Sequence, residues 1–224
     1  MSRSTAERPS TRGVRIVVFA KAPVTGQVKT RLIPSLGAQG AADLARRMLA
    51  QTLAQAEAAA VGPVELCVTP SPSNPVWRSL VVPAGVTWSD QGDGNLGSRM
   101  ARAARRIIAT GEAVLLIGTD CPALDAEHLR RAATALQQFD ATIIPTADGG
   151  YVLLGLNRFH PSLFDDIEWS TDSVARETRQ RLAELGWSVR DAPPLHDIDE
   201  PADLRWLPHG WLDGEADPRL ERAK

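Results

Sequence analysis

Hydrophobic positions fall into two patterns along the chain: short β-branched runs, and longer Ala- and Leu-rich segments with apolar residues at helical spacing. Short uninterrupted apolar runs are typical of strands buried on both faces of a parallel sheet. They predict strands at residues 14–20, 64–69, 113–118, 141–145 and 151–156, with shorter strands at 86–88 and 188–191. Helices are predicted at 39–60, 98–109 and 173–185, and more weakly at 76–81. A further helix is predicted to follow Asp125, which would be its N-cap. This alternation predicts an α/β fold, a mostly parallel sheet with helices on both faces.

Length and charge narrow the class of protein. A chain of 224 residues that is 43% hydrophobic can form a single domain. We expect that domain at 14–207, after a mobile N-terminal tail at 1–13 and before a C-terminal extension at 208–224. The net charge of -2 offers no positive excess for nucleic acid or an anionic membrane.

Cysteine placement and the first apolar run bear on the compartment. Cys67 and Cys121 lie in or beside apolar runs rather than at metal-ligand spacing, so we expect reduced thiols in a cytoplasmic protein. The apolar run at 14–20 is far shorter than a signal sequence core or a membrane span. We therefore expect no targeting or spanning segment.

The loop after the first predicted strand combines a glycine with three cations. Ala20 ends the strand, and Lys21, Gly26, Lys29 and Arg31 follow. In parallel sheets ligands bind outside the carboxyl ends of the strands. These five residues are therefore candidates for nucleotide binding, with the cations neutralising phosphates. A solvated basic loop is an equally good interpretation, and the residue order excludes a Walker A loop.

The loop at residues 91–97 is rich in glycine. Gly92 and Gly94 allow close approach of a base or ribose, and Asp93 can accept hydrogen bonds from either. We count these three residues as further nucleotide-binding candidates. A plain flexible connection would have the same composition.

Asp120 follows the most apolar of the predicted strands and precedes the rigid Pro122. A carboxylate at this edge can hold Mg²⁺ or Mn²⁺ while phosphates and water complete the coordination. The alternative is a cap for the following helix, although Asp125 fills that role more naturally. Metal binding is the favoured interpretation.

A glycine-rich turn follows the next strand. Asp148, Gly149, Gly150 and Tyr151 re-enter the sheet at the edge where Asp120 is expected. An acceptor or a sugar hydroxyl could be held there, with Asp148 as general base. An ordinary hairpin turn is the alternative.

Two acids occupy alternate positions near the C-terminus. Asp197 and Asp199 face one side if the segment is extended. Either can supply a second metal ligand, while Asp199 can equally be the N-cap of a helix that begins at Pro201. Ser170 or Thr171 reads as a cap for the helix at 173–185.

Six motifs occur in a fixed order over residues 14–204. They are Phe19-Ala-Lys-Ala-Pro-Val-Thr-Gly-Gln-Val-Lys-Thr-Arg-Leu32, Gln91-Gly-Asp-Gly-Asn-Leu-Gly97, Gly118-Thr-Asp-Cys-Pro122, Asp148-Gly-Gly-Tyr151, Trp169-Ser-Thr171 and Asp197-Ile-Asp-Glu-Pro201. Together they resemble the DUF2064 family of GT-A type transferases, which includes proposed arsenosugar-biosynthesis glycosyltransferases. The resemblance implies the Rossmann-like nucleotide-diphospho-sugar transferase fold, shared with the molybdenum-cofactor and phospholactate guanylyltransferases.

The resemblance also implies roles for site residues. Asp120 would bind the metal, Asp197 or Asp199 would add a ligand, and Lys29 and Arg31 would contact phosphates. The chain offers one carboxylate at the end of the central strand, where glycosyltransferases of this fold usually present Asp-x-Asp. That departure is closer to the nucleotidyltransferase pattern.

The leading prediction is metal-dependent glycosyl transfer from a nucleotide-diphospho-sugar to a small-molecule acceptor. Lys29 would assist departure of the diphosphate, and Asp148 would activate the acceptor hydroxyl. One alternative is a nucleotidyltransferase that releases pyrophosphate from a nucleoside triphosphate. Another is a non-catalytic nucleotide-binding module. No nucleic-acid or membrane partner is expected, and the sequence allows a homodimer.

Overall fold

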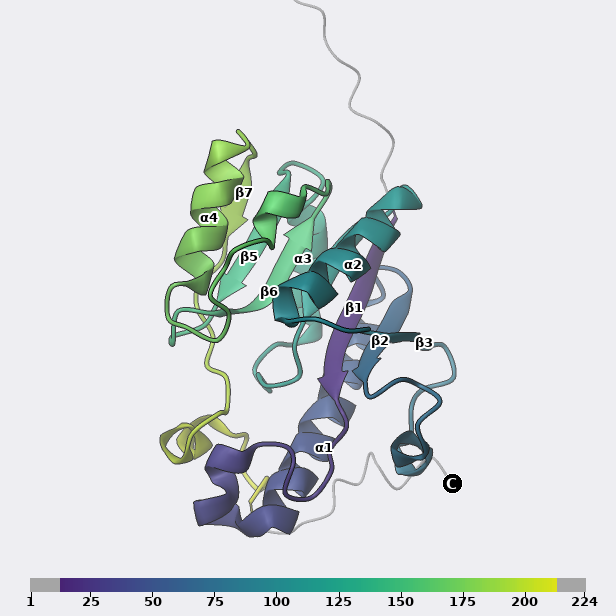
Figure 1. Cartoon of the computed structure of the whole chain (residues 1–224), viewed down its shortest axis with the longest axis vertical. Helices are drawn as coiled ribbons and strands as arrows, with labels where there is room; N and C mark the ends of the chain where they lie inside the picture. The colour runs from purple at the N-terminus through teal and green to yellow at the C-terminus, as the bar shows by residue number, and fades with distance from the viewer. Residues whose placement is uncertain (1–12, 213–224) are drawn as a thin grey trace, which may run out of the picture.

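A twisted, mostly parallel sheet runs through the centre of the protein (Figure 1). The structure is a computed structural model and describes residues 13–212. Within this range the strands are β1 (Val14–Lys21), β2 (Val64–Thr69), β3 (Thr87–Asp90), β4 (Ala113–Ile117), β5 (Ala141–Pro145), β6 (Tyr151–Leu156) and β7 (Val189–Asp191). Their order is β3-β2-β1-β4-β6-β5-β7, and only β6 runs antiparallel to its neighbours. The predicted α/β fold is confirmed.

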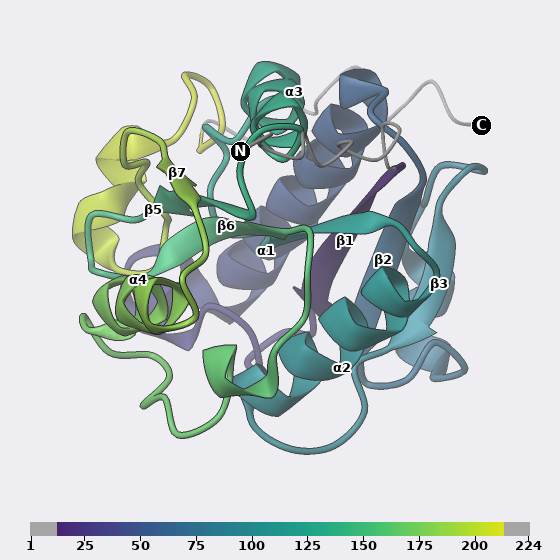
Figure 2. The same ribbon diagram turned by 90° about the horizontal axis from the view of Figure 1, so that it is seen from above.

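Helices cover both faces of the sheet (Figure 2). They are α1 (Ile33–Ala59), α2 (Leu96–Ala109), α3 (Ala126–Ala135) and α4 (Val174–Glu184). Helices α1 and α3 pack on one face, and α2 and α4 pack on the other. Each face has its own apolar cluster, because successive side chains of a strand point to opposite sides.

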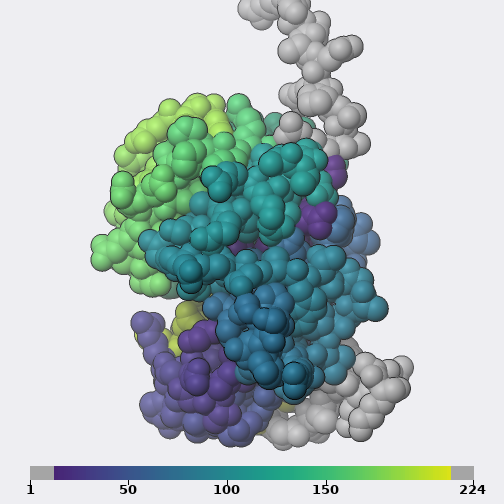
Figure 3. Space-filling model, turned by 45° about the vertical axis from the view of Figure 1, so that its right-hand side comes forward, coloured from purple at the N-terminus to yellow at the C-terminus, as the bar shows by residue number. Residues whose placement is uncertain are grey.

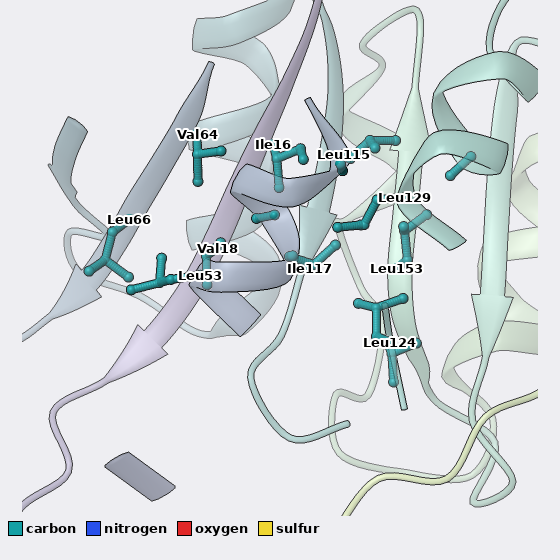
Figure 4. Packing of buried hydrophobic residues seen from close by; sticks show 14 of the residues in the cluster. Ile16, Val18, Leu53, Val64, Leu66, Leu115, Ile117, Leu124, Leu129 and Leu153 are labelled. Carbon is teal, nitrogen blue, oxygen red and sulfur yellow. The ribbon is translucent and has the colours of Figure 1, made fainter. Parts of the chain in front are cut away.

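The cluster beneath α1 and α3 illustrates this alternation (Figure 4). Ile16 and Val18 of β1 point toward Leu53 of α1 and Leu129 of α3. Val17, between them in sequence, belongs to the cluster under α2 and α4. All three β1 residues are fully buried, which explains why this strand reads as an uninterrupted apolar run.

Some predicted boundaries are wrong for identifiable reasons. Helix α1 begins at Ile33 rather than near residue 39, because a short turn joins it across a kink at Gly37, whose φ is 69°. The predicted weak helix is a 3₁₀ helix, Pro75–Ser79. Further 3₁₀ helices are Thr30–Leu32, Pro161–Leu163 and Pro201–Trp206.

Helix caps settle several of the open alternatives. The carboxylate of Asp125 accepts a hydrogen bond from the backbone N–H of His128 at 2.9 Å, which confirms it as the N-cap of α3. Glu200, not Asp199, is the N-cap of the 3₁₀ helix that begins at Pro201. The capping interpretation of Asp199 is therefore wrong.

The segment before α4 also differs from its prediction. Ser173 is the N-cap of α4, so neither Ser170 nor Thr171 caps this helix. The hydroxyl of Thr171 instead donates to the backbone oxygen of Glu168 at 2.7 Å. Ser170 has a left-handed backbone, with φ at 66°.

The ends of the chain bear on the predicted domain limits. The predicted tail at 1–13, apart from Gly13, and the part of the predicted extension beyond residue 212 lie outside the described residues. Among residues 13–212, no helix is long and apolar enough to cross a membrane.

The parallel strands β1, β2, β3 and β4 place their carboxyl ends at one edge of the sheet. The antiparallel β6 begins at that same edge, where Leu153 pairs with Ile117 of β4. All the loops predicted to carry function therefore open on one side of the molecule. In the space-filling view the surface is indented between the N-terminal segment in purple and the later segments in green (Figure 3).

Candidate functional site

Three segments far apart in the sequence meet at the ammonium group of Lys29. Its Nζ lies 2.6 Å from Oδ1 of Asp120, in the loop after β4, and 2.7 Å from Oδ1 of Asp199, in the late acidic segment. It also donates a hydrogen bond to the backbone oxygen of Ile198 at 2.6 Å. The structure thus brings together three of the residues that the sequence singled out.

Apolar packing holds the late segment in place. Ile198 is fully buried in a cluster with Leu32, Leu44 and Met48, which attaches the segment to α1 and the turn before it. The backbone N–H of Ile198 donates to the backbone oxygen of Asp120 at 2.8 Å. Because neighbours of a buried residue in extended chain point the other way, the acids on either side of Ile198 face the site.

Burial divides the site into an inner cation and outer carboxylates. The side chain of Lys29 is 5% exposed, whereas those of Asp120 and Asp199 are 48% and 44% exposed. Burial alone would lower the pKa of Lys29, but the charges of the two carboxylates outweigh it and raise the pKa above its ordinary value. The lysine is therefore fully charged at neutral pH.

Asp197 lies in a more negative environment. Its pKa is raised to about 6 by burial and by the charges of Asp148 and Asp199. The Asp148 turn is joined to this segment, because the backbone N–H of Ala147 donates to Leu195 O at 3.2 Å. The predicted acceptor turn and the late acids thus share one side of the site.

The oxygen groups around Lys29 suit a divalent cation. Two carboxylates and a backbone carbonyl converge on one point, and Mg²⁺ and Mn²⁺ prefer such oxygen ligands. Residues 13–212 hold no group of three or more His, Cys, Asp or Glu side chains arranged for a metal. A bound metal would therefore need phosphate oxygens or water to complete its coordination, as is usual for nucleotide-bound Mg²⁺.

The other nucleotide-binding candidates of the opening loop differ in their contacts. The side chain of Arg31 is 72% exposed and lies 3.6 Å from Glu200, the residue after Asp199. The ammonium of Lys21 donates to the backbone oxygen of Gln27 at 2.7 Å and so closes the opening loop on itself. Gly26 in that loop has a φ of 76°, a conformation that favours glycine.

Gln91 is a structural residue that the sequence analysis missed. It is buried, and its amide donates to the backbone oxygens of Ala20 at 3.1 Å and Cys67 at 3.0 Å. The glycine-rich loop is thereby fastened to the ends of β1 and β2. Gln91 directly follows β3 (Thr87–Asp90), but the predicted strand at 86–88 stopped short of it, so the sequence carried no signal for this role.

Two arginines of α2 hold the rest of the glycine-rich loop. Arg99 donates to the backbone oxygen of Gly94 at 2.9 Å, and Arg102 donates to those of Gln91 and Asp93. A Cβ added at Gly92 would lie 2.7 Å from the Arg102 guanidinium. The loop is therefore a fixed structure rather than the flexible connection that the alternative interpretation described.

The Asp148 turn is also tightly packed. Asp148 accepts hydrogen bonds from the hydroxyl of Thr146 and from the N–H of Gly150, the latter at 3.1 Å. Gly149 has a φ of 93°, and a Cβ there would lie 2.1 Å from the backbone oxygen of Asp172. Packing against the start of α4 thus requires glycine at this position.

Tyr151 differs from its neighbours in the turn. Its hydroxyl is enclosed in the interior of the protein, and burial raises its pKa. The structure does not bring this hydroxyl to the site surface, so its predicted contact with an acceptor has no support from the geometry.

Trp169 packs against Gly97, where the glycine-rich loop passes into α2. A Cβ added at Gly97 would lie 2.3 Å from Trp169 Nε1 and 2.7 Å from the backbone oxygen of Phe164. Trp169 therefore packs directly on the first turn of α2. Its role in the structure is support, which the sequence pattern did not reveal.

Comparison with solved structures identifies the fold. A proposed nucleotide-diphospho-sugar transferase from Desulfovibrio desulfuricans G20 is 29% identical, with 94% of each chain covered and a TM-score of 0.82. Rv0371c from Mycobacterium tuberculosis H37Rv, in complex with manganese, is 17% identical over 91% of this chain and 100% of its own, with a TM-score of 0.50. The 4-diphosphocytidyl-2C-methyl-D-erythritol synthase from Anaerococcus prevotii is 11% identical over 88% and 97%, with a TM-score of 0.55. The chain has the nucleotide-diphospho-sugar transferase fold.

Comparison with sequences identifies the family. No curated protein matches the chain. The family described as "Uncharacterized protein conserved in bacteria (DUF2064)" matches residues 52–171, more than half of the sequence. The match includes the glycine-rich loop, Asp120, the Asp148 turn and the Trp169 motif. The chain belongs to the DUF2064 family.

Proposed function

We propose that this protein is a metal-dependent transferase that moves a glycosyl group from a nucleotide-diphospho-sugar to a small-molecule acceptor. The observation that supports it most is the convergence of Lys29, Asp120 and Asp199 at the carboxyl edge of the sheet. In open α/β sheets this edge is where ligands bind. The similarity to a proposed nucleotide-diphospho-sugar transferase along nearly the whole chain agrees with it.

Asp120 and Asp199 are the proposed metal ligands. Mg²⁺ or Mn²⁺ bound there would neutralise the charge that develops on the leaving diphosphate. Asp197, beside Asp199, is a further candidate, although it is not among the groups that contact Lys29. The manganese complex of a structural neighbour is consistent with use of such a metal.

Cations and the glycine-rich loop are proposed to hold the donor. Lys29 and Arg31 would contact phosphate oxygens, with Lys21 and Gly26 shaping the opening loop around them. Gly92, Asp93 and Gly94 would lie against the base or ribose. The hydrogen bonds from α2 hold this loop in one shape, which reduces the entropy lost on binding.

The acceptor is proposed to bind beside the Asp148 turn. Asp148 would take the proton of the attacking hydroxyl as general base, while the backbone of Gly149 and Gly150 borders the acceptor. The charge interaction between Asp148 and Asp197 supports a position for Asp148 near the late acids. As general base, Asp148 would have to lie within hydrogen-bond reach of the acceptor hydroxyl.

Nucleotidyl transfer is the second candidate, and one observation favours it. Thr119-Asp120-Cys121 offers a single carboxylate at the end of β4. In this reaction the same cations would stabilise attack on the α-phosphate, with pyrophosphate as leaving group.

Product analysis separates the candidates. The purified protein is incubated with Mn²⁺ and a panel of nucleotide-sugars and nucleoside triphosphates, in the presence of small hydroxylated acceptors. Release of a nucleoside diphosphate supports glycosyl transfer, and release of pyrophosphate supports nucleotidyl transfer. Nucleotide binding without either product indicates a non-catalytic module and contradicts the proposal. Asp125→Ala, which alters a helix cap outside the site, is the control for Asp120→Asn.

A further inference from the structure

The ammonium group of Lys29 fills the point where three protein oxygens converge. The oxygens belong to the side chains of Asp120 and Asp199 and to the backbone of Ile198, all within 2.7 Å of Nζ. A lysine ammonium has three N–H donors and no acceptor. That of Lys29 donates to Asp199 and to the backbone oxygen of Ile198, and it forms an ion pair with Asp120. Because the Lys29 side chain is 5% exposed, a phosphate can contact its ammonium only if that group leaves some of these oxygens.

A divalent cation would need the same position. Mg²⁺ binds oxygen at about 2.0–2.1 Å. Its ligands would therefore draw in by about 0.6 Å from the 2.6 and 2.7 Å at which the carboxylates contact the ammonium. One point cannot hold both cations, so either the ammonium or the metal occupies it.

The two cations would reach this point from different sides. Asp120 and Asp199 are nearly half exposed, which leaves them open to a metal that arrives from solvent. Lys29, whose side chain is 5% exposed, reaches the point from the opening loop on a left-handed backbone, with φ at 48°. For a residue other than glycine this conformation is strained and persists only while surrounding contacts hold it. The two ion pairs are among those contacts.

We propose that Lys29 is a resident counter-cation that occupies the divalent-cation position until the phosphates of a donor draw it away. The inference rests on the proposed function, because it takes Asp120 and Asp199 as metal ligands and Lys29 as a phosphate contact. On donor binding, the ammonium exchanges carboxylate oxygens for phosphate oxygens, and the carboxylates become free for the metal. Metal and donor then bind cooperatively, and each raises the affinity for the other by the same factor.

Manganese binding in the absence of nucleotide tests the exchange. Lys29→Met removes the ammonium and keeps an unbranched apolar side chain. We expect it to bind Mn²⁺ at least about tenfold more tightly than the unaltered protein, within the usual range of coupling between sites. Free Mn²⁺ is measured by electron paramagnetic resonance. Arg131→Met, which removes an exposed cation of α3, is the charge-matched control and leaves Mn²⁺ affinity unchanged.

A second measurement uses the unaltered protein. Its Mn²⁺ affinity rises when UDP, GDP, CDP or ADP binds, after correction for Mn²⁺ held by free nucleotide, and this rise is absent in Lys29→Met. Equal or weaker Mn²⁺ binding by a folded Lys29→Met protein would overturn the exchange and make Lys29 a support for the carboxylates. If the variant does not fold, the unaltered protein still decides: an Mn²⁺ affinity that none of the four nucleotides changes would overturn the exchange.

Asp120→Asn distinguishes this inference from the proposed function. If Asp120→Asn loses Mn²⁺ while Lys29→Met gains none, the exchange fails and the metal site stands. If Asp120→Asn binds Mn²⁺ as tightly as the unaltered protein in the presence of nucleotide, the metal site itself is wrong.

Discussion

Arg106 on α2 pairs with a carboxylate inside the sheet, and its removal tests how α2 is fastened to β2. The side chain of Glu65 is 4% exposed and accepts hydrogen bonds from both terminal nitrogens of Arg106 and from Ser89. Arg106→Met keeps an aliphatic stem and leaves the carboxylate with Ser89 alone. Breaking a buried ion pair from one side costs about 3–5 kcal/mol. Arg106 is itself 45% exposed, so water can reach the carboxylate. We therefore expect Arg106→Met to lower the free energy of unfolding by about 2–3 kcal/mol.

The pH dependence of this loss has a definite sign. Burial raises the pKa of Glu65, but its hydrogen bonds with Arg106 and Ser89 and the charge of Arg106 hold it below the ordinary value of 4.5. In the unaltered protein the pair stabilises the fold above that value and the contribution is lost as the pH falls below it. In Arg106→Met the burial remains without the cation, so the pKa of Glu65 rises and the folded state favours the protonated acid. The difference in free energy of unfolding between the unaltered protein and Arg106→Met is therefore largest at neutral pH and becomes smaller as the pH falls toward about 4.

Urea unfolding across this pH range measures the effect. A double-mutant cycle with Glu65→Gln isolates the pair, and we expect a coupling free energy of about 1–2 kcal/mol at neutral pH. A deficit that does not change with pH, or a coupling near zero, would refute the assignment of Glu65 as a buried charge neutralised by Arg106.

Two further predictions concern packed positions. Gly97→Ala lowers the free energy of unfolding by about 1–3 kcal/mol in urea titrations, because a Cβ there would lie 2.3 Å from Trp169 Nε1. Adding Trp169→Leu recovers part of this loss, whereas an alanine variant of unchanged stability would contradict the packing. The Cys121 thiol, whose pKa burial raises to about 11, resists a thiol reagent in the native protein at mildly alkaline pH and reacts after denaturation. Rapid labelling of the native thiol would contradict its burial.

Features with a local signal were predictable from the sequence. The run from Val14 to Ala20 became β1 almost without change, because most of its residues are β-branched or aromatic and favour a strand by themselves. Asp125 was identified as a cap because a capping acid bonds to the backbone three residues ahead. The placement of Asp120 at the carboxyl edge followed from its position just after β4, which runs parallel to β1.

Contacts between distant segments were not predictable from local patterns. Lys29 and Asp199 are 170 positions apart, and nothing near either residue shows that the ammonium lies between two carboxylates. The buried Ile198 determines where Asp199 lies, because its packing on α1 fixes the late segment. The sequence Asp197-Ile198-Asp199 indicated that the two acids face the same side, but it did not identify Lys29 as the partner of Asp199.

Motif glycines have a second reason for their identity that only packing reveals. Gly149 and Gly97 give room to backbone and aromatic groups from the segment before α4. The sequence motifs placed both glycines in candidate ligand-binding loops. Close approach of a ligand and close approach of a neighbouring segment require the same residue, so the sequence alone does not separate them. Three-dimensional contacts separate the two causes at these positions.

We expect nucleotide binding to depend on a divalent metal that Asp120 helps to hold. Calorimetric titration of UDP, GDP, CDP and ADP, with and without Mn²⁺, tests it most directly in the unaltered protein, Asp120→Asn and the helix-cap control Asp125→Ala. We predict Mn²⁺-dependent binding of at least one nucleotide in the unaltered protein and the control, and a loss of nucleotide affinity of at least about tenfold in folded Asp120→Asn. Binding by Asp120→Asn that equals that of the unaltered protein, with the same dependence on Mn²⁺, would contradict the account.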